Sequence, residues 1–329
     1  MDIRVLCGFR FFKLDENSEY EINPIILTSN FEIINKEFSS VGFESLVGKC
    51  RIKTFEIEPS FGYNILKHPD PINYDFQHFM QDAARMSGKI NSFFSFLWFV
   101  KDCRSHISEI IFFSQEKGWI TINPNYETYS SSNGESEYST FNLEELKYAE
   151  SIWKKLSVIT STRKTKKPYP YPIKRGVIQD IGNLRPYNES SRIERAMNFL
   201  FFARRASFMP MKIAMYIPIF ESLFSSETTE ISHKVAERCS FYLGGSREDK
   251  IKNYDIIKKA YDIRSKLLHG ANLTEKPSHN NHNKIETQIE ISTEIDCLTR
   301  EVLTKVIMED SEIFLANDMS SFYKQLIFS

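Results

Sequence analysis

The sequence has few cysteines, and none of them form a pattern that points to a metal site or a disulfide framework. The five cysteines are an odd number, lie far apart and include no CxxC pair. Zinc ribbons and disulfide-rich secreted domains both require closely spaced or paired cysteines. We therefore expect a protein of a reducing cytosol that carries no metal and no cofactor.

Long hydrophobic runs and a strong net charge are also missing. The most apolar stretch, FFSFLWFV at 93–100, is far shorter than the roughly 20 residues that cross a bilayer. The first residues, MDIRVLCGFRFFKLDE, lack the apolar core and cleavage site of a signal peptide. With a net charge of -1, no global field draws the chain to nucleic acid. We expect a soluble, cytoplasmic protein with no membrane partner, in which any nucleic-acid contact is local.

Residues 1–162 are predicted to form a mixed α/β domain. Alternating or clustered apolar and β-branched residues predict strands at 4–14, 50–58, 107–113 and 118–122, the last two forming a hairpin. Apolar residues at steps of three and four predict a helix over 75–104. The polar, serine-rich residues 123–139 are expected to form an exposed loop, followed by a helix that ends near residue 159.

A basic segment at 163–185 marks the expected domain boundary. Between 163 and 175 it carries six basic residues, no acid, and prolines that alternate with tyrosines. Such a segment cannot be helical and is typical of an extended linker. Its lysines Lys164, Lys166 and Lys167 could follow an RNA backbone. A solvated tether between domains is the other interpretation, and the sequence slightly favours it.

Residues 186–329 are predicted to be all helical, which makes the chain α+β overall. The spacing of apolar residues predicts helices, with a serine cap near 190 and a stop at Gly244-Gly245 marking two of their ends. The predicted helices are 190–205, 210–224, 228–243, 247–269 and 285–316. Short connections between such helices are typical of an antiparallel bundle.

The most informative segment is YDIRSKLLHG at 261–270. The core-facing positions of its helix are predicted to be Ile256, Ala260, Ile263 and Leu267, which leaves Arg264 and His269 off the apolar stripe. Ser265 and His269 are four residues apart and share a face. His269 falls in the last turn, where the helix dipole favours an imidazolium.

These residue types suit metal-independent RNA cleavage. A group that titrates near neutral pH must move protons to and from the 2′-hydroxyl and the leaving 5′-oxygen, and a fixed cation must hold the phosphate. Histidine supplies the first and arginine the second. An Arg-x4-His match on its own is weak, because His269 could simply end its helix.

The wider context resembles the HEPN superfamily, and most closely its ApeA-like branch. The resemblance lies in SRIERAMNFLFFARRA, in KIAMYIPIFESLFS with EISHKVAERCSFYLG, and in YDIRSKLLHG. It covers roughly the C-terminal 140 residues and does not reach the first 160. It implies a helical bundle, often dimeric, in which two Arg-x4-6-His motifs face one cleft.

The resemblance also implies an activity and a setting. Many members are endoribonucleases of antiviral or toxin–antitoxin systems. By position, Arg264 would bind the phosphate and His269 would act as acid and base. Lys266, in the same segment, is a further candidate RNA contact. The implied partners are RNA, a second copy of the chain, and an antitoxin or phage-derived trigger sensed by residues 1–162. Active members often carry a more strongly polar residue where Ser265 stands.

Several alternatives stay open. Ser265 favours a non-catalytic HEPN module that dimerises and binds RNA or a partner. An enzyme in the N-terminal domain ranks last, since no nucleophile–base pair stands out there. Glu221, in the apolar helix MYIPIFESLF, is predicted either to pair with Arg264 and orient the site or to lie exposed. His233 has no acidic or metal partner nearby in sequence and is expected to be structural.

Overall fold

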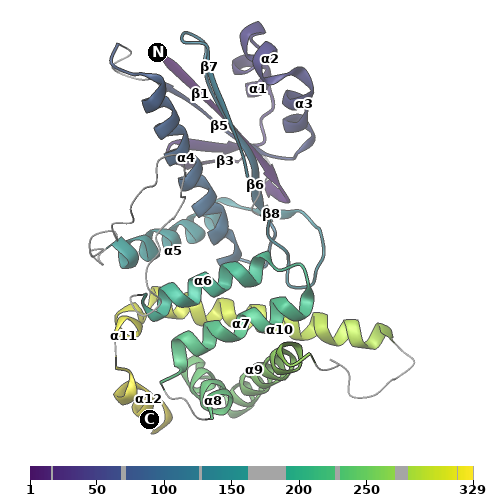
Figure 1. Cartoon of the computed structure of the whole chain (residues 1–329), viewed down its shortest axis with the longest axis vertical. Helices are drawn as coiled ribbons and strands as arrows, with labels where there is room; N and C mark the ends of the chain where they lie inside the picture. The colour runs from purple at the N-terminus through teal and green to yellow at the C-terminus, as the bar shows by residue number, and fades with distance from the viewer. Residues whose placement is uncertain are drawn as a thin grey trace, which may run out of the picture. The chain divides into compact units, whose positions relative to one another are not determined.

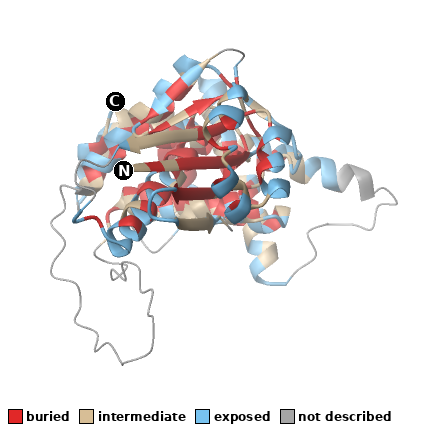
Figure 2. Ribbon diagram, turned by 90° about the horizontal axis from the view of Figure 1, so that it is seen from above, coloured by how far each residue is buried: buried red, intermediate tan, exposed pale blue. Residues whose placement is uncertain are grey.

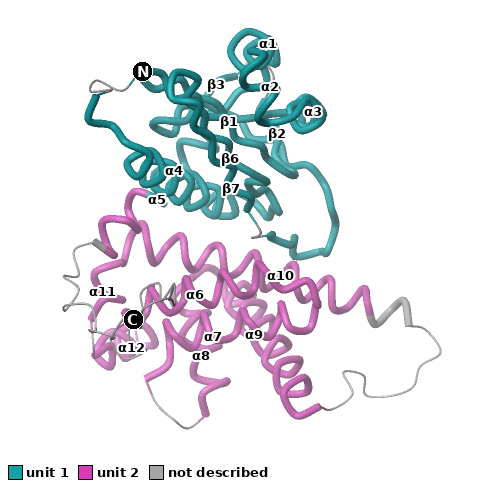
Figure 3. The backbone as a smooth tube through the Cα atoms, turned by 45° about the horizontal axis from the view of Figure 1, so that its top comes forward, with its two compact units in different colours: residues 1–153 teal, residues 154–329 magenta. Residues whose placement is uncertain are grey.

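The computed structural model divides into two compact units, Met1–Trp153 and Lys154–Ser329 (Figure 3). It describes residues 1–15, 18–67, 72–125, 128–161, 190–226, 230–270, 281–316 and 318–328, the side chains of 161 and 281–284 excepted. The first unit is an antiparallel sheet with helices and the second is all helical, which confirms the expected α+β class. The predicted linker at 163–185 lies outside the described residues.

The first unit is built on a six-stranded antiparallel sheet of order β3-β4-β5-β1-β6-β7. Its strands are β1 (Asp2–Arg10), β3 (Glu19–Ile22), β4 (Ile25–Thr28), β5 (Phe61–Lys67), β6 (His106–Ser114) and β7 (Trp119–Pro124). A separate parallel pair joins β2 (Phe12–Leu14) to β8 (Ser139–Phe141). The predicted hairpin is confirmed as β6–β7, and the central strands are buried (Figure 2).

Helices cover both faces of this sheet (Figure 1). On one face, α1 (Glu32–Glu37), α2 (Val41–Val47) and α3 (Lys49–Ile57) share a core with Leu6 and Ile111. On the other, α4 (Phe76–Phe96) packs on β6 and β7, and Phe94 lies 4.6 Å from Phe9 between ring centroids. A final helix, α5 (Leu143–Ser161), begins in this unit.

Three predictions for the first unit are wrong in detail. Residues 50–58 form the helix α3 rather than a strand, because Ile52 and Phe55, three apart, bury one helical face. The helix predicted to reach residue 104 ends at Phe96, followed by a 3-10 turn at Leu97–Phe99. The loop at 123–139 is not wholly exposed, since Tyr129 and Ser132 are buried.

The second unit is a bundle with α7 at its centre. Its helices are α6 (Arg192–Arg205), α7 (Met209–Phe224), α8 (Ile231–Leu243), α9 (Arg247–Leu268), α10 (Asn281–Met308), α11 (Ser311–Leu315) and α12 (Ser320–Phe328). α7 contacts α6, α8, α9 and α10, which is why most of its residues are buried and most of the buried ones are apolar. No described helix in either unit meets the length and apolarity that a membrane crossing requires.

The ends of these helices follow the local sequence. Ser191 caps α6 in a capping box with Glu194, and Gly244 ends α8 at a φ of 77°, as predicted. The long helix predicted over 285–316 is wrong in its bounds. It begins at Asn281, breaks after Met308 and resumes as the short helix α11.

Candidate functional site

The helix α9 carries the predicted motif and is fixed at both ends. At its start Ser246 and Asp249 form a capping box, with the Asp249 N–H donating to Ser246 Oγ at 3.1 Å. At its end the backbone N–H of His269 donates to the Ser265 carbonyl at 3.1 Å. Gly270 follows with a φ of 62°, a conformation that favours glycine. The motif therefore occupies the last turns of a well-terminated helix.

The buried face of α9 is rotated from the predicted one. Ile256 and Ala260 are buried as expected, but the other members of the buried stripe are Ile257 and Tyr261. The predicted core positions 263 and 267 are only partly buried. Ile257, Tyr261 and Arg264 follow one another at steps of four and three, so Arg264 extends the buried face rather than lying off it. This correction explains why Arg264 meets α7.

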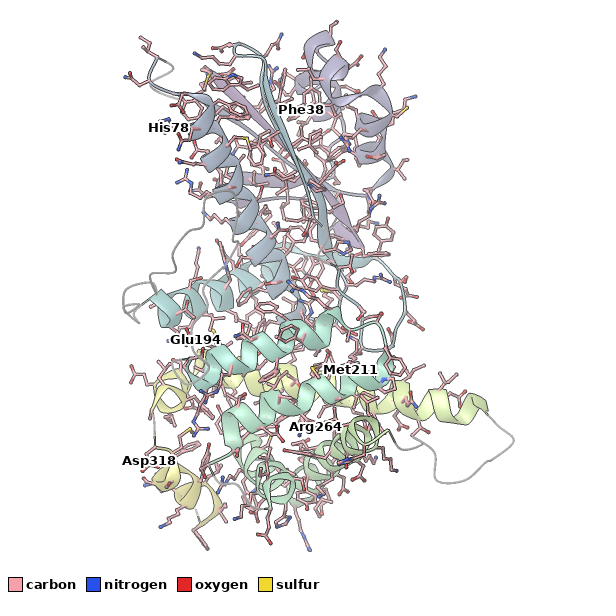
Figure 4. The ribbon with its side chains drawn as sticks, in the orientation of Figure 1. Phe38, His78, Glu194, Met211, Arg264 and Asp318 are labelled. Atoms are coloured by element: carbon pink, nitrogen blue, oxygen red, sulfur yellow. The ribbon has the colours of Figure 1, made fainter. Side chains whose placement is uncertain are left out.

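Glu221 of α7 binds Arg264 directly (Figure 4 labels Arg264 on α9). Arg264 Nη1 lies 2.6 Å from Glu221 Oε1, and the same oxygen accepts a hydrogen bond from the Tyr261 hydroxyl at 3.1 Å. The pairing of Glu221 with Arg264 is one of the two alternatives that the sequence leaves open; the other, an exposed Glu221, is not what the structure shows. The two charged side chains are 28% and 25% exposed, so the ion pair is partly withdrawn from water.

The contacts among Glu221, Tyr261 and Arg264 fix one nitrogen of the Arg264 guanidinium and leave the other two available to a ligand. Burial, and then the charge and hydrogen bond of Glu221, raise the pKa of Tyr261 above its usual range, so Tyr261 stays a neutral donor. Among the described residues, Nε and Nη2 of Arg264 donate to no protein group. A guanidinium anchored through one nitrogen can still present the others to a phosphate.

His269 and Ser265 are exposed at the end of α9. Within the described part of the chain, neither side chain forms a hydrogen bond or ion pair, and His269 does not contact Arg264 or Glu221. Lys266 is partly buried nearby. The structure therefore brings Glu221 and Arg264 together and leaves His269 exposed, without a hydrogen bond to either of them.

The other predicted site residues are placed as follows. Lys164, Lys166 and Lys167 lie outside the described residues. No cluster of three or more metal-ligating side chains occurs in the described ranges. An open depression of about 360 Å³ lies on the face of α9 towards α10, and no residue of the motif at 261–270 lines it. Its lining residues are Glu248, Ile251, Lys252, Asp255, Ile256, Lys259 and Glu294.

Tyr261 belongs to the site, although the sequence patterns did not single it out. The sequence feature that could have identified it is its position three residues before Arg264, on the same helix face. The true buried stripe keeps Ile256 and Ala260 and extends to Ile257 and Tyr261, each about 100° further round the helix, instead of to Ile263 and Leu267.

Comparison with protein-family models, with curated proteins and with solved structures finds no match for this chain.

Proposed function

We propose that the helical unit is a metal-independent endoribonuclease of the HEPN kind, with Arg264 as the phosphate-binding cation and His269 as acid and base. The supporting observation is the Arg264–Glu221 contact, which fixes a cation about 7.5 Å along the helix axis from an exposed imidazole. Glu221 orients the guanidinium, and Ser265 can donate one hydrogen bond to the substrate.

The chemistry needs only these groups and the RNA. The substrate's 2′-oxygen attacks phosphorus while an imidazole removes its proton, and the 5′-oxygen leaves with a proton donated by imidazolium. A 2′,3′-cyclic phosphate and a 5′-hydroxyl result. Arg264 stabilises the charge that builds on the phosphate oxygens. In a homodimer formed through the helical units, two motifs would serve one cleft.

The biological setting is proposed by family analogy. The chain would act in the cytoplasm as a toxin or an abortive-infection effector against phage, with the N-terminal unit sensing a trigger or an antitoxin. This setting is inferred from the HEPN resemblance of the helical unit.

A second candidate is a non-catalytic module that dimerises and binds RNA or a partner protein. It is favoured by the engagement of Arg264 with Glu221 and by the absence, among the described side chains, of any contact between Arg264 and His269. In this case Glu221 serves only to neutralise a partly buried cation.

Paired substrates test the proposal. The purified full chain is incubated in EDTA with a structured RNA and with the same sequence carrying 2′-O-methyl groups, which have no nucleophile. We expect only the unmodified RNA to be cut, with cyclic phosphate ends. Cutting of both substrates would refute the mechanism, and binding without cutting would support the second candidate.

A further inference from the structure

A row of polar side chains continues along α9 from the Arg264 site towards the start of the helix. Tyr254, Lys258 and Tyr261 follow one another at steps of four and three, so they share a face. Each meets a polar group of a neighbouring helix. Beyond the Tyr261–Glu221 contact, Lys258 Nζ donates to Ser232 Oγ of α8 at 3.1 Å. One turn further, His233 Nδ1 lies 2.8 Å from the Tyr254 hydroxyl.

Lys258 is a partly buried cation that forms no ion pair among the residues the structure describes. Its one hydrogen bond within the described part of the chain goes to the neutral Ser232 hydroxyl, and the acids one turn away, Asp255 and Asp262, form no ion pair with it. An ammonium has three donors, of which this contact uses one. A partly desolvated charge that lacks a partner favours binding of an anion. Arg264 differs, because Glu221 already neutralises it.

Two aromatic side chains lie one turn from this cation along α9, or next to Ser232 on α8. The rings of His233 and Tyr254 are 5.7 Å apart between centroids and inclined at 77°. His233 is exposed and Tyr254 is partly buried. Tyr254 lies about 6 Å from Lys258 along the axis of α9. Aromatic side chains next to a cation are the usual surface for single-stranded nucleic acid, since bases stack on rings while phosphates meet the charge.

We propose that Lys258 and Ser232 bind a phosphate of single-stranded RNA and that His233 and Tyr254 receive its neighbouring base. Lys258 lies about 9 Å along the helix axis from Arg264, so the row would hold the strand beside the scissile phosphate. The identity of the ligand as RNA rests on the proposed function. The adjacent rings favour an oligonucleotide over free phosphate.

Binding of a labelled 2′-O-methyl oligonucleotide to the full chain, measured by fluorescence anisotropy over a range of salt concentrations, tests the cation. Lys258→Gln keeps a donor for Ser232 but removes the charge. We expect its Kd to rise about tenfold and the slope of log Kd against log salt to fall by about 0.7, the loss of one phosphate contact. Lys258→Arg should restore both values.

The matched control is Lys259→Gln, which removes the same charge one residue away, on the face that lines the open depression. We expect its Kd to stay within about twofold of wild type. Thermal melts check folding, and Lys258→Met serves as a second charge-free variant. Equal effects at positions 258 and 259, or no binding by the wild type, would overturn the proposal. So would displacement of the oligonucleotide by inorganic phosphate at constant ionic strength, which would assign the site to free phosphate.

Tyr254→Leu tests the stacking surface separately. We expect a Kd about tenfold weaker with an unchanged salt slope, because a ring releases no counterions. An unchanged Kd would remove the base-binding part of the proposal. Failure of the ribonuclease proposal is distinct, because it appears as absence of RNA cleavage while Lys258-dependent binding persists.

Discussion

Replacing Glu221 with alanine removes the carboxylate that joins α7 to α9. Its Oε1 accepts hydrogen bonds from Arg264 Nη1 and from the Tyr261 hydroxyl. Exposed ion pairs contribute about 0–1 kcal/mol, and breaking a buried pair costs about 3–5 kcal/mol. With exposures of 28% and 25%, this pair lies between those limits.

The expected loss of stability is the sum of the costs at Tyr261 and at Arg264 once the carboxylate is removed. The Tyr261 side chain is buried and its hydroxyl would lose its acceptor, at a cost of about 1–2 kcal/mol. Arg264 reaches water and adds about 1 kcal/mol. We therefore expect Glu221→Ala to lower the free energy of unfolding by about 2–3 kcal/mol, and Glu221→Gln, which keeps an acceptor, by about 1 kcal/mol.

Urea denaturation can follow the two units separately. The three tryptophans, Trp98, Trp119 and Trp153, all belong to the first unit, so their fluorescence reports that unit. Far-UV circular dichroism adds the helices of the second. We expect Glu221→Ala to shift the helical transition and leave the tryptophan transition in place. Glu290→Ala, at an exposed acid of α10, is the control. A loss within about 0.5 kcal/mol of that control would refute the view that Glu221 fixes Arg264.

Three further perturbations test the surroundings of the site. Because the pKa of Tyr261 is raised, the folded chain keeps a proton that an unfolded tyrosine loses above about pH 10, so stability falls as pH rises beyond that point. Between pH 7 and pH 11, urea titrations should show the free energy of unfolding of the wild type falling by about 1 kcal/mol relative to that of Tyr261→Phe. An equal pH dependence of the two proteins would contradict the raised pKa. Ser246→Ala should cost about 1 kcal/mol in the same assay through loss of the α9 cap, and an unchanged free energy of unfolding would show that the capping box is dispensable. Asp296→Ala should cost about 3 kcal/mol or more, because Asp296 is 2% exposed and accepts from Tyr216; a loss under about 1 kcal/mol would show that the core adapts.

Much of the fold could be predicted because local patterns and tertiary packing agree. The hairpin β6–β7 follows from apolar residues at strand spacing on both sides of a short turn. In the second unit, helical spacing together with the Ser191 cap and the Gly244 stop places α6 and α8. In each case the signal lies within a few residues of the feature that it predicts.

The helix α3 could not be predicted because its burial depends on distant residues. In CRIKTFEIE the apolar positions fit a strand as well as a helix, and the segment is too short for the period to decide. What decides is the sheet beneath it. A Cβ at Gly8 of β1 would lie 3.1 Å from Phe55 Cε1, so the glycine leaves room for that ring. Nothing within 50–58 reveals this contact.

The candidate site was predictable only in part, because some of its contacts depend on packing between helices that are distant in sequence. Glu221 is a lone acid in an apolar helix, and a partly buried carboxylate needs a cationic partner, so pairing with Arg264 was one of the two alternatives predicted for it. Tyr261 was missed because the apolar residues of α9 fit two neighbouring stripes, and only packing on α7 selects the one that includes Ile257. The exposure of His269 depends on where α9 ends relative to its neighbours.

The most direct test of the central claim compares RNA cleavage in EDTA by the wild type, by His269→Ala and by His78→Ala. His78 is an exposed histidine of the first unit and controls for the loss of an imidazole. We predict that His269→Ala slows cleavage by about 10²–10⁴-fold while His78→Ala cuts at the wild-type rate. Equal cleavage by all three proteins would contradict the assignment of His269 as the acid and base.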